Sequence, residues 1–213
     1  MPTFKDATSL QAFLNSQRTG NNTVGFVPTM GALHKGHLAL VTSALSQNEI
    51  VVVSIFVNPT QFGNAGDLKN YPRTLSKDEA LLKTLHNDII VFAPNAEDLY
   101  NGNITSNSYN FGAIANEMEG KYRQGHFNGV GTVLELLFDI VKPDYAYFGE
   151  KDFQQLQIVR KLISLTKQPV TIVGCPIYRE NSGLAMSSRN ERLSKERRDA
   201  SACDCKTLQK VKE

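Results

Sequence analysis

The stretch that most constrains the fold is residues 25–41, GFVPTMGALHKGHLALV, which reads as a strand, a turn and a helix. It opens on apolar residues, passes through Pro28 and Gly31, and brings His34 and His37 to the start of a segment with helical apolar spacing. The N–H groups at a helix N-terminus have no partners within the helix and carry the positive end of its dipole, so this junction favours a phosphate. The two histidines lie three residues apart, on one face of the first turn beside that phosphate.

The next apolar segment, residues 50–57 (IVVVSIFV), has the composition of a strand covered on both faces. A strand, a helix and a strand in this order predict a parallel sheet with a right-handed crossover. We therefore predict an α/β fold, a Rossmann-like doubly wound parallel sheet, with a ligand crevice at the carboxyl ends of its strands. Other strands are expected at 23–28, 89–92, 145–148 and 169–173, helices at 7–17, 36–46, 75–85, 132–141, 157–166 and 192–211, and loops at 67–73 and 95–108.

Composition excludes several classes of partner. A net charge of +2 over 213 residues favours neither nucleic acid nor a membrane surface. No apolar run approaches the length of a membrane span, and none follows Met1 as in a secretory signal. Three cysteines, one of them necessarily unpaired within the chain, are typical of a reducing compartment. We expect a soluble cytoplasmic protein that acts on small molecules.

The histidine pair admits a second interpretation, because His-x-x-His can form half of a zinc site. No convincing four-ligand pattern is present among the remaining candidates, which are His86, His126, Cys175, Cys203 and Cys205. Imidazoles that act on a phosphate are therefore favoured, and no metal ligand is predicted in the protein.

The segment 28–37, PTMGALHKGH, resembles the signature of the pantoate–β-alanine ligases, the pantothenate synthetase family. Its last four residues match the HxGH motif of the wider nucleotidylyltransferase superfamily. The resemblance implies an ATP site that includes Met30, Gly31, Ala32, Leu33, His34, Lys35, Gly36 and His37. The family description gives His37 a proton-donor role, whereas the chemistry is satisfied equally by hydrogen-bond stabilisation of the developing charge.

A second motif, NPTQF at residues 58–62, comes directly after the strand at 50–57. From the residues alone, Gln61 is an ordinary loop residue, but the family carries Asn-Pro-x-Gln-Phe here, which implies that Gln61 hydrogen-bonds pantoate. Asp78 lies near the position of a family acidic residue at the nucleotide site, although an exposed helix carboxylate is the commoner meaning. Arg123 and His126 belong to another segment that is similar in the family. One interpretation is that they orient the site or contacts with a neighbouring subunit. The other is that His126 is a packed or capping histidine.

A third motif begins at the strand end near residue 149. Lys151 and Gln155 are four residues apart, so one helical face directs both into the same crevice. A lysine there provides a point charge for a polyphosphate, although a Lys-Asp pair is usually a surface ion pair. The resemblance implies that Gln155 helps to hold pantoate and that ATP is bound by Gly149, Glu150, Lys151 and Asp152.

The last motif is the run of residues 186–189, MSSR. Two hydroxyl groups and a guanidinium can hydrogen-bond several phosphate oxygens together. In the superfamily this is the mobile phosphate loop, so the resemblance adds Met186, Ser187, Ser188 and Arg189 to the ATP site. Tyr178 lies at the position of a nucleotide contact, where it would pack on adenine.

Taken together, the resemblance implies ATP-dependent condensation of pantoate with β-alanine through pantoyl adenylate, with Mg²⁺, in a homodimer. His37, His34, Lys151 and Arg189 are the expected catalytic residues. One alternative is a nucleotidylyltransferase that stops at a nucleotidyl conjugate, and another is a catalytically incomplete ATP-binding fragment. The second arises because family members continue into a C-terminal domain. We expect a nucleotide-binding domain at 1–182, with the phosphate loop and the beginning of that domain at 183–213.

Overall fold

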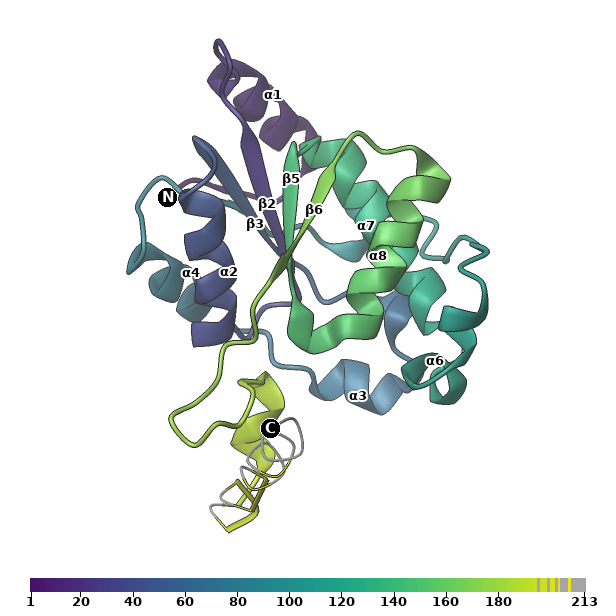
Figure 1. Cartoon of the computed structure of the whole chain (residues 1–213). Helices are drawn as coiled ribbons and strands as arrows, with labels where there is room; N and C mark the ends of the chain where they lie inside the picture. The colour runs from purple at the N-terminus through teal and green to yellow at the C-terminus, as the bar shows by residue number, and fades with distance from the viewer. Residues whose placement is uncertain (195, 199, 202, 204–206, 208–213) are drawn as a thin grey trace.

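The computed structural model describes residues 1–194, 196–198, 200–201, 203 and 207 (Figure 1). These residues contain one sheet of six parallel strands, in the order β1-β4-β3-β2-β5-β6. The predicted α/β Rossmann-like fold is therefore confirmed. The strands are β1 (Thr3–Phe4), β2 (Val24–Thr29), β3 (Ile50–Ile55), β4 (Ile90–Phe92), β5 (Tyr145–Gly149) and β6 (Thr171–Cys175).

Helices connect the strands and cover both faces of the sheet (Figure 1). None of the described helices has both the length and the apolar content that a membrane crossing requires. The α-helices are α1 (Ala7–Gln17), α2 (Lys35–Leu45), α3 (Ala65–Asn70), α4 (Leu75–Lys83), α5 (Ala96–Leu99), α6 (Glu119–Tyr122), α7 (His126–Val141) and α8 (Phe153–Thr166). The 3₁₀ turns are η1 (Pro59–Gln61), η2 (Ala113–Asn116), η3 (Glu150–Asp152) and η4 (Ser188–Arg192).

The apolar strands supply two cores because successive side chains of a strand point to opposite faces. In β2, Val24 and Phe26 pack with α1, α7 and α8, whereas Val27 packs with α2 and α4. In β3, Val52 and Val53 divide in the same way. A strand buried on both faces explains why residues 50–57 are apolar except for Ser54.

The order of the strands locates the ligand crevice. The central strand β2 pairs with β3 on one side and with β5 on the other, so the chain reverses its direction of winding between them. At such a switch point the connections after neighbouring strands leave in opposite directions and open a crevice at the carboxyl ends. The histidine motif follows β2, and Lys151 follows β5.

Several local predictions were wrong. Helix α7 begins at His126 rather than at residue 132. Its start was predicted too late because Gly129 and Gly131 weaken a helix intrinsically. In the structure these two glycines lie in close tertiary contact with η1 and with Tyr109. The predicted loop 67–73 instead contains the end of α3, whose cap is Asn64: its Oδ1 accepts from the N–H of Gly66 over 2.7 Å.

Two short elements also went unpredicted: α5 lies inside the predicted loop 95–108, and β1 is too short to show a period. The helix predicted at 192–211 falls largely outside the described residues, and the domain division at 182/183 stays a prediction.

Candidate active site

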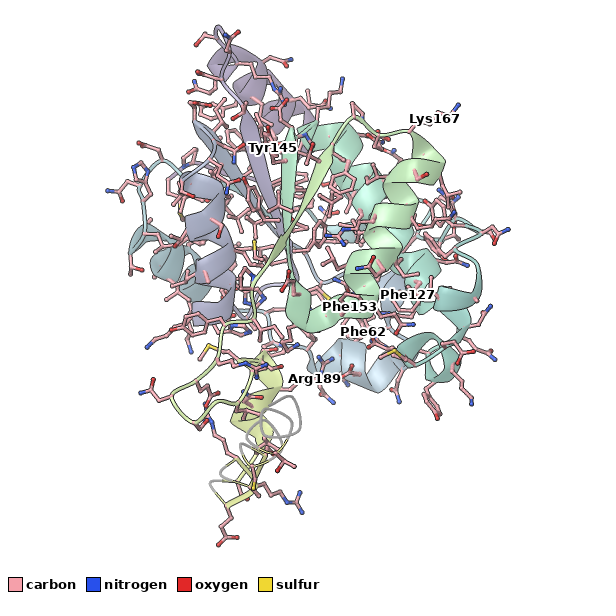
Figure 2. All side chains as sticks on the ribbon, viewed as in Figure 1. Phe62, Phe127, Tyr145, Phe153, Lys167 and Arg189 are labelled. Atoms are coloured by element: carbon pink, nitrogen blue, oxygen red, sulfur yellow. The ribbon has the colours of Figure 1, made fainter. Side chains whose placement is uncertain are left out.

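A cavity of about 260 Å³ lies at the carboxyl ends of β2 and β5. Figure 2 shows Phe62 and Arg189 at this lower end of the sheet, far from Tyr145 at the start of β5. The four motifs, which are distant in the sequence, all contribute residues to this cavity. The predicted site residues that line the cavity are Met30, His34, Gly36, His37, Gln61, Gly149, Lys151, Asp152, Gln155, Tyr178, Met186, Ser187, Ser188 and Arg189.

Five predicted ATP-site residues do not line the cavity, namely Gly31, Ala32, Leu33, Lys35 and Glu150. The first three form the turn between β2 and α2, in which Gly31 and Ala32 have left-handed φ angles of 79° and 50°. Lys35 and Glu150 are exposed. Contact between these residues and a nucleotide stays a prediction.

The two imidazoles form a reciprocal cap at the start of α2. The Nδ1 atom of His34 accepts from the N–H of Gly36 over 3.1 Å, and the Nδ1 atom of His37 accepts from the N–H of His34 over 3.2 Å. A Cβ on Gly36 would lie 2.9 Å from the His34 ring, so glycine is what lets that ring fold over the backbone. An accepting Nδ1 leaves the proton of a neutral ring on Nε2. Both rings line the cavity as N–H donors, with centroids 4.0 Å apart.

The electrostatics of the pair keep both rings neutral. Burial lowers the pKa of His37 to about 3, and the neighbouring His34 and Lys151 act in the same direction. Burial and then Lys151 also lower the pKa of His34. A neutral imidazole near pH 7 has no acidic imidazolium proton to transfer. Together with the cap, which leaves both Nε2–H groups at the cavity, this favours hydrogen-bond donation over the proton-donor role.

Asp78 is not the exposed helix carboxylate that its sequence position favoured. It is 2% exposed, and its oxygens accept from the N–H groups of Ala32 over 3.1 Å and Leu33 over 2.8 Å. The Thr74 hydroxyl donates a third hydrogen bond over 3.2 Å. Helix α4 thus fixes the turn that leads into His34. The prediction that Asp78 is exposed was wrong because the sequence of a helix does not show whether a distant loop covers one of its positions, as the loop of Ala32 and Leu33 does here.

Gln61 is likewise buried rather than on a loop surface. Its Oε1 accepts from Asn58 Nδ2 over 3.0 Å, and its Nε2 lies 3.0 Å from the sulfur of Met30. Asn58 is held in turn by the Tyr100 hydroxyl, which donates to its Oδ1 over 2.6 Å. The side-chain amide of Gln61 is therefore fixed at the edge of the cavity.

Lys151 and Gln155 both line the cavity, but they do not share one regular helix. Lys151 belongs to η3, and α8 begins at Phe153. The Nζ atom of Lys151 lies 2.9 Å from Oδ1 of Asp152. The pair is partly exposed, so this ion pair contributes little stability by itself. An anion in the cavity would compete for the ammonium.

The Ser-Ser-Arg segment faces α3, which the sequence did not reveal. Arg189 Nη2 lies 3.9 Å from Oδ2 of Asp67. The buried Tyr71, at the end of α3, packs edge-on against Phe62. Burial is the main cause that raises the pKa of Tyr71, and the Ser188 side chain acts to lower the pKa of the same hydroxyl. The phosphate-loop candidates thus lie within reach of the same cavity as the histidines.

One wall of the cavity is apolar and was missed. It consists of side chains of α7 together with one residue that follows β3, namely Phe56, Val130, Val133, Leu134 and Leu137. Their spacing in α7 is helical, which in a sequence indicates only a buried face. Because a cavity wall and a packed core have the same pattern, no signal distinguished them.

The zinc interpretation finds no support in the part of the chain that the structure describes. No group of three or more His, Cys, Asp or Glu residues there could hold a metal ion. The Nδ1 atoms of both motif histidines already accept backbone hydrogen bonds.

Comparison with known proteins decides the family. Residues 2–213 match the family described as pantoate-beta-alanine ligase. A pantothenate synthetase from Christiangramia forsetii is 54% identical over 209 residues, which are 98% of this chain and 74% of that protein. One from Flavobacterium psychrophilum is 52% identical over 209 residues, with the same coverage. The chain belongs to the pantoate–β-alanine ligase family.

Solved structures of pantoate–β-alanine ligases have the same fold. The pantothenate synthetase of Thermus thermophilus matches with a TM-score of 0.89 and 44% identity, over 98% of this chain and 74% of that one. The pantoate–β-alanine ligase of Francisella tularensis, described as a complex with beta-gamma ATP and β-alanine, matches with a TM-score of 0.91 and 39% identity, over 98% of this chain and 79% of that one. The chain thus spans about three quarters of these relatives.

Proposed function

We propose that this chain is a pantoate–β-alanine ligase that uses ATP to form pantothenate, AMP and pyrophosphate. The observation that carries the proposal is the meeting of the histidine pair, Lys151 and the Ser-Ser-Arg segment around one cavity that also contains Gln61 and Gln155. The first three groups suit a triphosphate. Two neutral amides suit the hydroxyl groups of a small acid.

The neutral amides favour a ligase over a nucleotidylyltransferase that acts on a phosphorylated substrate. A second phosphate would need cations where Gln61 and Gln155 lie. Arg123, a guanidinium that lines the cavity and donates to the Gln61 carbonyl oxygen, is already paired with Glu119. The apolar wall of α7 suits the two methyl groups of pantoate.

In the first step, a carboxylate oxygen of pantoate attacks the α-phosphorus of ATP. The new P–O bond forms as the bond to pyrophosphate breaks, and charge gathers on the phosphate oxygens. The Nε2–H groups of His34 and His37 would donate to that charge. Because backbone hydrogen bonds to Nδ1 already hold both rings in place, the rings need no reorganisation. Lys151, Ser187, Ser188 and Arg189 would hold the polyphosphate.

In the second step, the amine of β-alanine attacks the acyl carbon of pantoyl adenylate. The C–N bond forms, the C–O bond to AMP breaks, and the amine loses its proton to solvent. Holding the adenylate and the amine in one cavity converts this step into an effectively intramolecular one.

We propose that Mg²⁺ arrives as part of the ATP complex. Mg²⁺ keeps several waters and is usually bound through substrate phosphates with one or two carboxylates. This fits a described site that has no cluster of metal ligands. Asp152, which lines the cavity beside Lys151, would provide a carboxylate for such a contact.

The test is a pyrophosphate-release assay over a panel of small hydroxy acids, with and without β-alanine, followed by mass spectrometry. We expect pantoate to be preferred and the products to be pantothenate and AMP. A stable nucleotidyl conjugate would support the nucleotidylyltransferase instead. ATP binding by calorimetry without pyrophosphate release would indicate a non-catalytic fragment.

His86 is exposed and outside the cavity, so His86→Asn should retain the activity that His37→Asn loses.

Family resemblance also supports a homodimer that acts in the cytoplasm. Multi-angle light scattering tests the first, with twice the 23.6 kDa chain mass expected. Cell fractionation tests the second.

A further inference from the structure

The backbone of Gln61 is held by two side chains, one from Arg123 at the C-cap of α6 and one from His126 at the start of α7. Its carbonyl oxygen lies 2.8 Å from Nδ1 of His126 and 3.3 Å from Nη2 of Arg123. His126 is only 4% exposed, so this hydrogen bond is shielded from water. The sequence left open whether His126 is a packed histidine or one that orients the site.

These contacts fix the tautomer of His126. A carbonyl oxygen can only accept, so Nδ1 carries the proton. Nε2 then has a free lone pair, and Nη1 of Arg123 lies 3.2 Å from it as a donor. Arg123 in turn pairs with Glu119. Burial is the largest cause that lowers the pKa of His126, in agreement with a neutral ring.

The helix and the loop also approach each other too closely for an ordinary side chain. A Cβ on Gly129 would lie 2.4 Å from the Thr60 carbonyl oxygen and 2.7 Å from the Gln61 nitrogen. The Gly129 carbonyl accepts from Asn58 Nδ2 over 3.1 Å. The same Asn58 nitrogen holds the Gln61 side chain, so α7 restrains both the backbone and the amide of Gln61.

We infer that His126, bridged to Arg123, is a positioning residue that fixes Gln61 for the hydroxy-acid substrate. This inference rests on the proposed function, because it assigns His126 to pantoate rather than to ATP. It follows that loss of the His126 hydrogen bond should weaken the use of pantoate while the ATP end of the cavity, built on α2 and η3, is unaffected.

The test compares His126→Asn with His126→Leu, which have similar shapes but differ in the ability to donate. The amide nitrogen of asparagine can replace Nδ1 as the donor to the Gln61 carbonyl, whereas leucine cannot. In the pyrophosphate-release assay we expect His126→Leu to raise the KM for pantoate about tenfold, as for one lost hydrogen bond. His126→Asn should stay within about threefold of wild type, and the KM for ATP should be unchanged in both.

A second measurement does not depend on turnover. In ¹⁵N NMR, the His126 ring should show a protonated Nδ1 and an unprotonated Nε2, and the side-chain amide signal of Gln61 should move in His126→Leu but not in His126→Asn. Equal KM values for pantoate in the two variants, a parallel rise of the KM for ATP, or an unmoved Gln61 signal would overturn the inference. A wild-type chain that releases no pyrophosphate with pantoate would instead contradict the proposed function, and the NMR comparison would still decide the role of His126.

Discussion

The N–H of Leu33 donates over 2.8 Å to the buried carboxylate of Asp78, which lies 45 residues further along the chain. The same carboxylate accepts from Ala32, in the turn where Gly31 and Ala32 have left-handed backbone angles. A turn of this kind is costly for a residue with a Cβ, and it persists when the surroundings hold it. Helix α4 therefore maintains the conformation on which the histidine cap depends.

Replacement of Asp78 by asparagine should disturb that turn. One oxygen can still accept, but the amide nitrogen would face an N–H donor and leave it unpaired, at a cost of about 1–3 kcal/mol in the free energy of unfolding. We expect a lower urea midpoint and a KM for ATP raised about tenfold. Asp88→Asn is the matched control, because Asp88 is exposed. If Asp78→Asn left both quantities at wild-type values, the carboxylate would have no positioning role.

Lys151 is expected to bind the polyphosphate. Lys151→Ala should lower the kcat/KM for ATP by about 100-fold, because a point charge beside the phosphates is removed from a partly enclosed cavity. Its folding stability should change little, since the ion pair with Asp152 is partly exposed. Lys161→Ala, on the exposed face of α8, is the control. Steady-state kinetics and calorimetry with ATP measure the effect, and a similar loss in the control would refute the assignment.

Much of the fold could be predicted from the sequence because its inner strands β2, β3 and β4 are buried on both faces. The apolar run at 50–57 and the strand–turn–helix at 25–41 sufficed for a parallel sheet, and the strand-end rule then brought His34, Gln61 and Lys151 to one edge. The positions of these motifs depend on the topology of the sheet, which the pattern of apolar residues in the sequence reveals well.

The supporting contacts could not be predicted, because they join side chains to a distant backbone. Asp78 and His126 each satisfy backbone groups of a loop far away in the sequence, and neither leaves a periodic signal. The glycines of α7 indicate a weak helix in the sequence, whereas in the structure they mark the place where η1 lies against it. The family resemblance suggested the neighbourhood of these residues, but not their partners.

Gly129→Ala tests that close approach. The added Cβ would lie 2.4 Å from a backbone oxygen, so α7 or η1 must move. Overpacking of this kind costs about 1–3 kcal/mol, and here it should also raise the KM for pantoate because Gln61 moves with η1. Gly63→Ala is the control, since nothing lies within 4 Å of its added Cβ. Urea unfolding and kinetics measure both effects, and a fully stable, fully active Gly129→Ala would mean that the loop is not held against the helix.

The neutral state of His37 leads to a pH prediction. The pKa of His37 is about 3 in the folded chain, against about 6.5 for an unperturbed histidine. As pH falls below 6.5 the unfolded chain therefore binds a proton that the folded chain does not, and this residue lowers the free energy of unfolding by up to about 1.4 kcal/mol per pH unit. The loss continues until the pH approaches 3, and it is absent above about pH 7.

His37→Asn isolates this contribution, because the asparagine oxygen can replace Nδ1 as the acceptor from the N–H of His34 while removing the titrating ring. The variant should match the wild type in stability at pH 8 and should lose less stability as the pH falls from 6.5 to 4. It should also release pyrophosphate about 100-fold more slowly, because the Nε2–H donor is gone. NMR of the wild-type ring should show no titration of His37 between pH 8 and 5. A titration midpoint near pH 6.5 would contradict this prediction. It would mean that His37 can exist as an imidazolium, which would support the proton-donor role.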